Sequence, residues 1–194
     1  MKGKFIVIDG MDGAGKTTLS RKLYLELRHN GYDVEALDNY YDQFCKDTFK
    51  IIENNNETPE VETLMFTSIF VHNYLNYVKP LINDGKIVIY DRWLTTTEAY
   101  QYEYLDSAIM ATDIFIAEPD LYIYLDVDEN TVLERFDRSG RIKDKWESGL
   151  EWGELKKCMD KVYNRHKAFF IDANKPIRKV LDETYKVIAN LINE

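Results

Sequence analysis

The sequence contains few of the residues that build disulfides and metal centres. Its 194 residues include two cysteines, Cys45 and Cys158, and three histidines. Two distant thiols do not make the disulfide framework of a small secreted domain, and with three scattered histidines they predict no structural metal site. We therefore expect a reduced, cytoplasmic protein without disulfides, in which His29, His72 and His166 lie on helix surfaces.

Long apolar runs and an excess of basic residues are also missing. We expect no signal peptide and no membrane span, because no stretch has the roughly 20 apolar residues that a spanning helix needs. The 25 basic and 34 acidic residues give a formal charge of −9. This sign argues against a protein that works mainly by gripping a nucleic-acid backbone. With 45% hydrophobic residues, the chain can bury one core, and we expect a single domain over residues 1–194.

The clearest pattern that is present joins a buried strand to a phosphate-binding loop. Residues 5–8 form an unbroken apolar run, which is typical of a parallel strand covered on both faces. Gly10, four further residues and Gly15-Lys16-Thr17 then match GxxxxGK[ST], a loop whose backbone N–H groups wrap phosphate oxygens. A helix predicted over 19–28 would point its positive end at the same phosphates. The bare pattern arises by chance in about one chain in a hundred of this size, and the flanking strand and helix make a simple glycine turn a weaker interpretation.

Strands and helices alternate along the rest of the chain. Further strands are predicted at 33–37, 86–90, 121–126 and 169–171. Helices are predicted at 58–83 with a bend or restart at Pro80, at 108–116, at 128–138 and at 153–168. Two further helices are predicted to begin at residues 95 and 176. Residues 38–44 show no clear period, and 53–58 read as a surface loop or helix end. The alternation predicts an α/β fold with a parallel sheet covered by helices on both faces.

The phosphate loop alone is compatible with GTPases, ATPases, sulfotransferases and kinases. A GTPase needs an NKxD-type base-reading motif, but the one Asn-Lys pair, Asn174-Lys175, is followed by proline and isoleucine. A helicase or a large ATPase needs more chain. The small size, the Asp91-Arg92-Trp93 motif after a strand and a basic segment at about 137–149 instead resemble a nucleoside monophosphate kinase, in which such a segment closes as a lid over ATP.

Over nearly its full length, the chain resembles the thymidylate kinase family. The matching stretches are 9–18 for EGxDGAGKTT, 64–66 at the start of a long helix, 79–80 near its end, 85–93 for GxIVIxDRY, 99–101 for AYQ and 119–127 for PDLxxxLDV. This resemblance implies a three-layer P-loop NTPase fold with a central, mostly five-stranded parallel sheet. It also implies a homodimer that uses ATP and Mg²⁺ to phosphorylate a deoxynucleoside monophosphate, with dTMP the expected acceptor.

The resemblance assigns roles to individual residues. The catalytic residues would be Lys16, Arg92, Arg138 and Arg141, and the ATP-binding loop would be Asp12, Gly13, Ala14, Gly15, Lys16, Thr17 and Thr18. The acceptor would contact Asp12, Tyr40, Phe66, Phe70, Arg92, Thr96, Thr97, Tyr100 and Gln101. Thr17, Asp9 and Asp91 would hold the metal. The alternative roles are strand-end capping for Asp9 and Asp91, and core packing for Phe66 and Tyr100.

The chain departs from the family pattern at two acceptor positions and in the lid. Tyr40 and Phe70 stand where the family has arginines, and Lys145 replaces an arginine of the lid. A charge-assisted contact is worth roughly 1.5–3 kcal/mol, enough to alter which base is preferred. Two alternatives therefore stay open: a kinase for another or modified pyrimidine deoxynucleotide, free or in DNA, and a non-catalytic nucleotide-binding relative. The second is disfavoured because the chain retains Lys16, Thr17, Asp91 and Arg92.

Overall fold

The computed structural model describes residues 3–55, 57–100, 115–140 and 152–193, and within them the chain forms one parallel sheet. Its strands are β1 (Lys4–Gly10), β2 (Val34–Asp38), β3 (Ile87–Asp91), β4 (Leu121–Asp126) and β5 (Phe169–Asp172). They lie in the order β2-β3-β1-β4-β5, and all four pairings are parallel. The predicted α/β fold with a five-stranded parallel sheet is confirmed.

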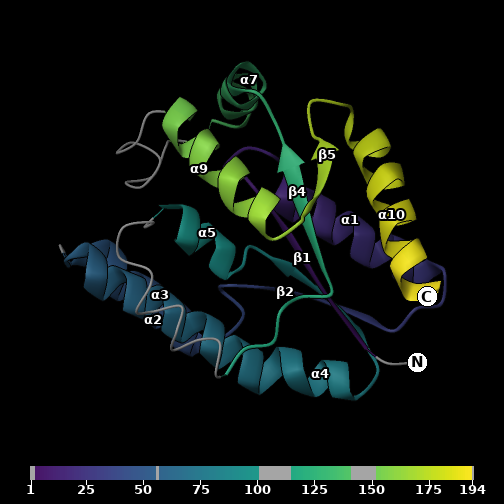
Figure 1. The fold of residues 1–194 in the computed structure, drawn as a ribbon, viewed down its shortest axis with the longest axis horizontal. Coiled ribbons are helices and arrows are strands. Elements are labelled where there is room, and N and C mark those ends of the chain that lie inside the picture. Colours follow the sequence, from purple (N-terminus) through teal and green to yellow (C-terminus); the bar gives the residue numbers. More distant parts are fainter. Residues whose placement is uncertain (1–2, 56, 101–114, 141–151, 194) are drawn as a thin grey trace.

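Helices cover both faces of the sheet (Figure 1). The helical segments are α1 (Lys16–His29), α2 (Gln43–Asn54), α3 (Pro59–Asn73), the π-helix η1 (Tyr74–Val78), α4 (Lys79–Asn83), α5 (Leu94–Tyr100), α7 (Glu129–Ser139), α9 (Trp152–Arg165) and α10 (Ile177–Asn193). Helices α1 and α10 contact each other on one side of the sheet. On the other side, α5 lies between α3 and α9 and contacts both. None of the helices in the described ranges is both long and apolar enough to cross a bilayer.

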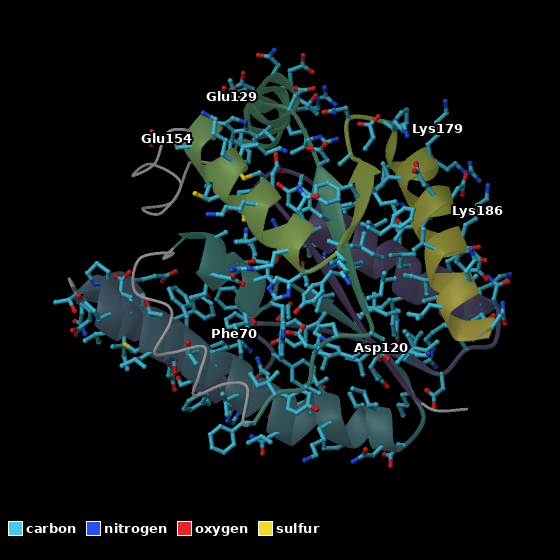
Figure 2. The ribbon with its side chains drawn as sticks, in the orientation of Figure 1. Phe70, Asp120, Glu129, Glu154, Lys179 and Lys186 are labelled. Carbon is cyan, nitrogen blue, oxygen red and sulfur yellow. The ribbon has the colours of Figure 1, made fainter. Side chains whose placement is uncertain are left out.

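The core lies between these layers because β1 is apolar on both faces. Phe5, Ile6, Val7 and Ile8 are at most 1% exposed, and burying each such side chain contributes about 1.5–3 kcal/mol. The side chains in Figure 2 show the matching outer surface: Lys179 and Lys186 lie on the outside of α10, and both are exposed. The short apolar run at 5–8 thus becomes the central strand of the sheet.

Two helix boundaries follow the local chemistry that the sequence predicts. Pro80 lies in the first turn of α4, where its missing N–H needs no partner, and the π-helix η1 directly precedes it, so the predicted restart is confirmed. Gly140 ends α7 with a φ of +66°, a left-handed conformation that glycine adopts without a steric cost.

The sequence analysis missed α2. Asp42 caps this helix by accepting a hydrogen bond from the Cys45 N–H at 3.0 Å, and its buried residues are Cys45, Thr48, Phe49 and Ile52. This 3-4-7 spacing after a capping aspartate is a helix signal that was present in the sequence. Of the helix predicted at 108–116, residues 115–116 are not helical and the rest lies outside the described residues.

The carboxyl ends of the strands bring acidic side chains to one edge of the sheet. Asp38 pairs in register with Asp91, Asp126 pairs with Asp172, and β1 carries Asp9 one residue before its end. Open α/β sheets bind ligands at this edge. The fold therefore places the phosphate loop, which leaves β1 at this edge, beside carboxylates from the neighbouring strands.

Candidate active site

A cavity of about 670 Å³ lies at this edge of the sheet. It is continuous from the phosphate loop to the residues after β2 and β3 on one side and to those after β4 and β5 on the other. The lining residues named in the sequence analysis are Asp12, Gly13, Ala14, Gly15, Lys16, Thr17, Thr18, Tyr40, Phe66, Phe70, Asp91, Arg92, Thr96 and Thr97. Residues that are far apart in the chain but assigned to one reaction thus share one space.

The phosphate loop is held by its own lysine. Lys16 Nζ donates hydrogen bonds to the carbonyls of Gly10 at 2.8 Å and Met11 at 3.0 Å and lies 3.4 Å from Asp12 Oδ1. The side chain is only 6% exposed, so Lys16 also stabilises the loop conformation. Gly15 has a φ of +97° immediately before α1, which requires a residue without a Cβ.

Thr17 and Asp91 form the part of the site that suits Mg²⁺. Thr17 Oγ1 donates to Asp91 Oδ2 at 2.5 Å, whereas Asp91 Oδ1 is buried and has no hydrogen-bond partner among the described residues. Burial raises the pKa of the Asp91 carboxyl, and the Lys16 ammonium and the Thr17 hydrogen bond partly offset this. A buried carboxylate oxygen without a partner beside a threonine hydroxyl is the oxygen donor set that a hard cation prefers.

Asp9 has a different environment. It is fully buried, and its carboxylate accepts hydrogen bonds from the N–H groups of Gly10 at 2.7 Å and Trp93 at 3.4 Å. The hydroxyl of Thr96 at 2.5 Å and that of Tyr163 also donate to Asp9. These contacts match the strand-end capping role that the sequence analysis kept as the alternative to metal binding.

Arg92 lines the cavity and has a strained backbone conformation. Its φ is +69°, in the left-handed region that non-glycine residues rarely adopt. Its guanidinium pairs with Asp12 Oδ1, which also faces Lys16. Such outliers occur where function demands a particular side-chain direction. The structure thus brings together Asp12 and Arg92, two of the residues that the family resemblance assigns to acceptor binding.

Aromatic rings line the acceptor side of the cavity. Tyr40 stacks on Phe49 with centroids 4.3 Å apart, and Phe66 meets Phe49 edge-on at 5.5 Å. Phe70 is 2% exposed, and its ring packs edge-on against Trp93 at 5.2 Å. Phe70 is therefore part of the core as well as of the cavity wall, whereas Tyr40 is half exposed.

The sequence analysis missed the side chain that joins α7 to the phosphate loop. Arg135 donates through Nη1 to the carbonyls of Gly13 at 2.9 Å and Ala14 at 3.1 Å, and through Nη2 to that of Ala173 at 2.7 Å. Phe136 lines the cavity beside it. Arg135 lies just before the basic segment at about 137–149 that the sequence analysis singled out, and nothing in the sequence reveals that this side chain turns towards the phosphate loop.

The remaining predicted site residues lie in the lid or near the end of α5. Arg138 is exposed in the last turn of α7. Gln101, Arg141 and the lid beyond residue 140 lie outside the described residues, as does the side chain of Tyr100. Their roles therefore stay predictions.

His29 lies exposed at the end of α1, as predicted, whereas His72 and His166 are only partly exposed and have acidic partners. His72 Nε2 lies 2.6 Å from Asp42 Oδ2, and His166 Nε2 lies 3.0 Å from the buried Glu98. Both side chains are about one quarter exposed. The absence of a disulfide is confirmed, because both cysteines are free.

Comparison with known proteins agrees with this geometry. The family described as thymidylate kinase matches residues 8–184. Thymidylate kinase from Brachyspira hyodysenteriae is 29% identical over 97% of this chain and 94% of its own length. The Haemophilus ducreyi thymidylate kinase is 27% identical over 99% and 96%, and the Francisella tularensis enzyme is 30% identical over 100% and 99%. The chain belongs to the thymidylate kinase family.

Proposed function

We propose that this protein transfers the γ-phosphate of ATP to dTMP and gives dTDP and ADP. The observation that carries the proposal is the continuous cavity, which has Lys16 and Thr17 of the phosphate loop on one side and Arg92 with an aromatic wall on the other. Phosphoryl transfer depends mainly on aligning two phosphate groups and neutralising their charge. A single cavity that can hold both nucleotides meets the first requirement.

The residues of the chain divide this work between donor and acceptor. Lys16 exchanges its loop carbonyls for the outer phosphates of ATP, and Arg92 exchanges Asp12 for the acceptor's phosphate, which its planar fork suits. Asp12 then accepts a hydrogen bond from the acceptor's sugar. Mg²⁺, held by Thr17 and Asp91, would supply further charge neutralisation.

The aromatic wall selects the acceptor's base by shape. Phe66 and Phe70 offer flat apolar faces, and Tyr40 and Phe70 provide no cation for the base or the phosphate. One methyl group in an apolar pocket is worth roughly 1–3 kcal/mol. We therefore expect kcat/KM for dTMP to exceed that for dUMP by no more than about 150-fold. The buried position of Phe70 also means that an arginine there would disturb the packing against Trp93.

Further elements of the proposal come from the family resemblance. They are the lid at about 137–149 with Arg138 or Arg141 near the transferred phosphate, the homodimer and a cytoplasmic location.

A panel of nucleoside and deoxynucleoside monophosphates, incubated with ATP and Mg²⁺ and followed by ADP release, tests the proposal. We expect the highest kcat/KM with dTMP. The matched variant is Lys16→Met, which keeps the aliphatic length but not the charge; it should lose at least about 100-fold in turnover while its circular dichroism is unchanged. ADP release only with a modified pyrimidine nucleotide or with DNA would instead favour a kinase for a modified pyrimidine deoxynucleotide, free or in DNA. ATP binding without turnover on any acceptor would refute kinase activity.

A further inference from the structure

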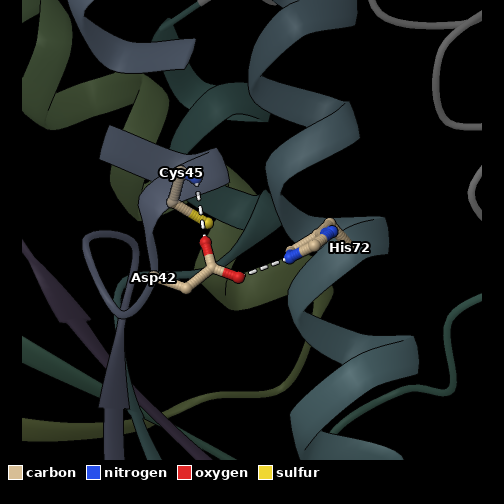
Figure 3. A group of neighbouring side chains, drawn as sticks. All are labelled: Asp42, Cys45 and His72. Atoms are coloured by element: carbon tan, nitrogen blue, oxygen red, sulfur yellow. Dashed lines mark hydrogen bonds and ion pairs between the residues drawn. The ribbon is translucent and has the colours of Figure 1, made fainter. Parts of the chain in front are cut away.

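Three metal-ligating side chains of different chemistry converge beside the acceptor side of the cavity (Figure 3). Asp42 caps the N-terminus of α2, Cys45 lies one turn into the same helix, and His72 comes from α3. Their ligand atoms all lie within 4.8 Å of one another. Cys45 is fully buried, whereas His72 and Asp42 are 25% and 21% exposed, so a fourth position can open to solvent.

The distances fit a four-coordinate metal after small side-chain movements. Zinc bonds of about 2.0–2.3 Å place tetrahedral ligand atoms about 3.3–3.8 Å apart. In this structure the Asp42 Oδ2 to His72 Nε2 distance is 2.6 Å, and the widest separation in the group is at most 4.8 Å. The observed separations therefore bracket the required ones, and each differs from them by about 1 Å.

Neighbouring groups hold these ligands in place. Tyr77 OH donates to Asp42 Oδ2 at 2.7 Å, and Tyr77 lies in the π-helix η1, a type of segment that is frequent at functional sites. His72 Nδ1 lies 3.2 Å from the amide of Asn76. The same amide nitrogen donates to the His72 carbonyl at 2.9 Å. If the amide turns, it gives up this bond and its oxygen accepts from Nδ1–H when Nε2 is a ligand, as second-shell partners of metal-bound histidines do.

We propose that Asp42, Cys45 and His72 bind a borderline-soft divalent metal of the Zn²⁺ class, with solvent in the fourth position. Sulfur, imidazole and carboxylate donors together favour such a metal over Mg²⁺ or Ca²⁺, which select oxygen ligands. The thiol proton of Cys45 passes to solvent as the Cys45–metal bond forms, because the thiolate is the ligand. This site is distinct from the one assigned to Thr17 and Asp91, and the proposal does not depend on the proposed kinase function.

The site is linked to the acceptor side of the cavity by hydrogen bonds. Cys45 Sγ donates to Asn73 Oδ1 at 3.2 Å, and Asn73 Nδ2 donates to Tyr90 OH at 2.5 Å. Tyr90 OH in turn donates to Asn39 Oδ1 at 2.9 Å, and Asn39 lines the cavity. Metal binding removes the Cys45 proton from the first of these bonds, and it clamps the segment that follows β2 onto α3.

Titration with Co²⁺, followed by displacement with Zn²⁺, tests the proposal on chelator-treated full-length protein. We expect one Co²⁺ per chain, with a thiolate-to-cobalt charge-transfer band in the near ultraviolet and d–d bands typical of four-coordination. Zn²⁺ should bleach both, whereas excess Mg²⁺ or ATP should not. Zn²⁺ should also raise the Tm of the protein.

Matched variants separate this site from adventitious binding. Cys158→Ser removes the other thiol and should leave the spectrum and stoichiometry unchanged, whereas Cys45→Ser should abolish the charge-transfer band. Because Cys45 is buried, its substitution could also impair folding, so His72→Gln at a partly exposed position provides a second test. This variant should remain folded but bind Zn²⁺ more than about 100-fold more weakly. Tyr77→Phe should weaken binding about 10-fold. The proposal is overturned if no band appears, if Cys158→Ser removes it, or if folded His72→Gln binds Zn²⁺ as tightly as the native chain.

Discussion

The contact between Gly13 and α7 can be tested with one methyl group. Gly13 has a φ of +81°, and a Cβ added there would lie 2.8 Å from Val132 Cγ1 and 2.9 Å from Phe136 Cε1. Gly13→Ala therefore introduces both backbone strain and a clash with the inner face of α7. The same helix carries Arg135, which binds the Gly13 and Ala14 carbonyls. We expect Gly13→Ala to lower both stability and activity.

The expected magnitude follows from separating the two effects. Alanine in a left-handed conformation costs about 1–2 kcal/mol, of which the lower entropy of the unfolded chain returns about 0.4–1 kcal/mol. Overpacking adds about 1–3 kcal/mol. Gly31→Ala is the matched control, because Gly31 has a φ of +86° but no atom within 4 Å of its added Cβ among the described residues. The two variants should therefore differ by the overpacking alone.

Denaturant unfolding and steady-state kinetics provide the measurements. We expect Gly13→Ala to be less stable than Gly31→Ala by about 1–3 kcal/mol, which corresponds to about 2–4 °C in Tm per kcal/mol for a chain of this size. The kcat should fall in Gly13→Ala and remain near native in Gly31→Ala. Equal stability of the two variants would show that α7 shifts to accommodate the added methyl group without a cost in stability. The contact between Gly13 and α7 would then not position the phosphate loop.

Substitutions at three other places test separate parts of the site. Arg92→Ala and Arg92→Gly should both raise KM for dTMP about 10- to 150-fold, as expected for a lost contact of 1.5–3 kcal/mol. KM for ATP should change little, and an equal rise of KM for both substrates would show that Arg92 has a structural role. Asp9→Asn should lower the free energy of unfolding without changing the Mg²⁺ dependence of kcat, and a weaker apparent Mg²⁺ affinity at native stability would refute the capping role. Alanine at Arg138 or Arg141 should lower kcat more than KM if that arginine acts only in the transition state; a higher KM for ATP at unchanged kcat would assign it to ground-state binding.

The positions of the strands and their parallel direction were predictable because they depend on short local patterns and on the alternation of strands with helices. The run at 5–8 is uniformly apolar, so it needs no partner information to be assigned to a buried parallel strand. The phosphate loop is similarly local, since its glycines, Lys16 and Thr17 are contiguous. These features fix one edge of the sheet as the site, and the cavity lies there.

The partners of individual charged groups were not predictable, because they come from distant elements. Tyr163 reaches Asp9 across 154 positions, and Arg135 reaches Gly13 across 122. Nothing near Asp9 in the sequence shows that its oxygens are already occupied, so capping and metal binding could not be separated. Likewise, the cluster of Asp42, Cys45 and His72 depends on the packing of α2 against α3, and α2 itself was missed.

The charge of the cavity explains why the reaction needs cations from outside its described walls. Among the described lining residues, four are basic, namely Lys16, Arg92, Arg135 and Lys175, and three are acidic, namely Asp12, Asp38 and Asp91. Arg135 already donates to three backbone carbonyls. A phosphate monoester alone carries about −1.5 to −2 charges at pH 7, and the triphosphate of ATP adds more. A net charge of +1 on the lining cannot balance both nucleotides. We therefore propose that Mg²⁺ and the basic residues of the predicted lid at 137–149 would be complementary sources of the missing charge. This proposal gives the lid an electrostatic role as well as that of excluding water.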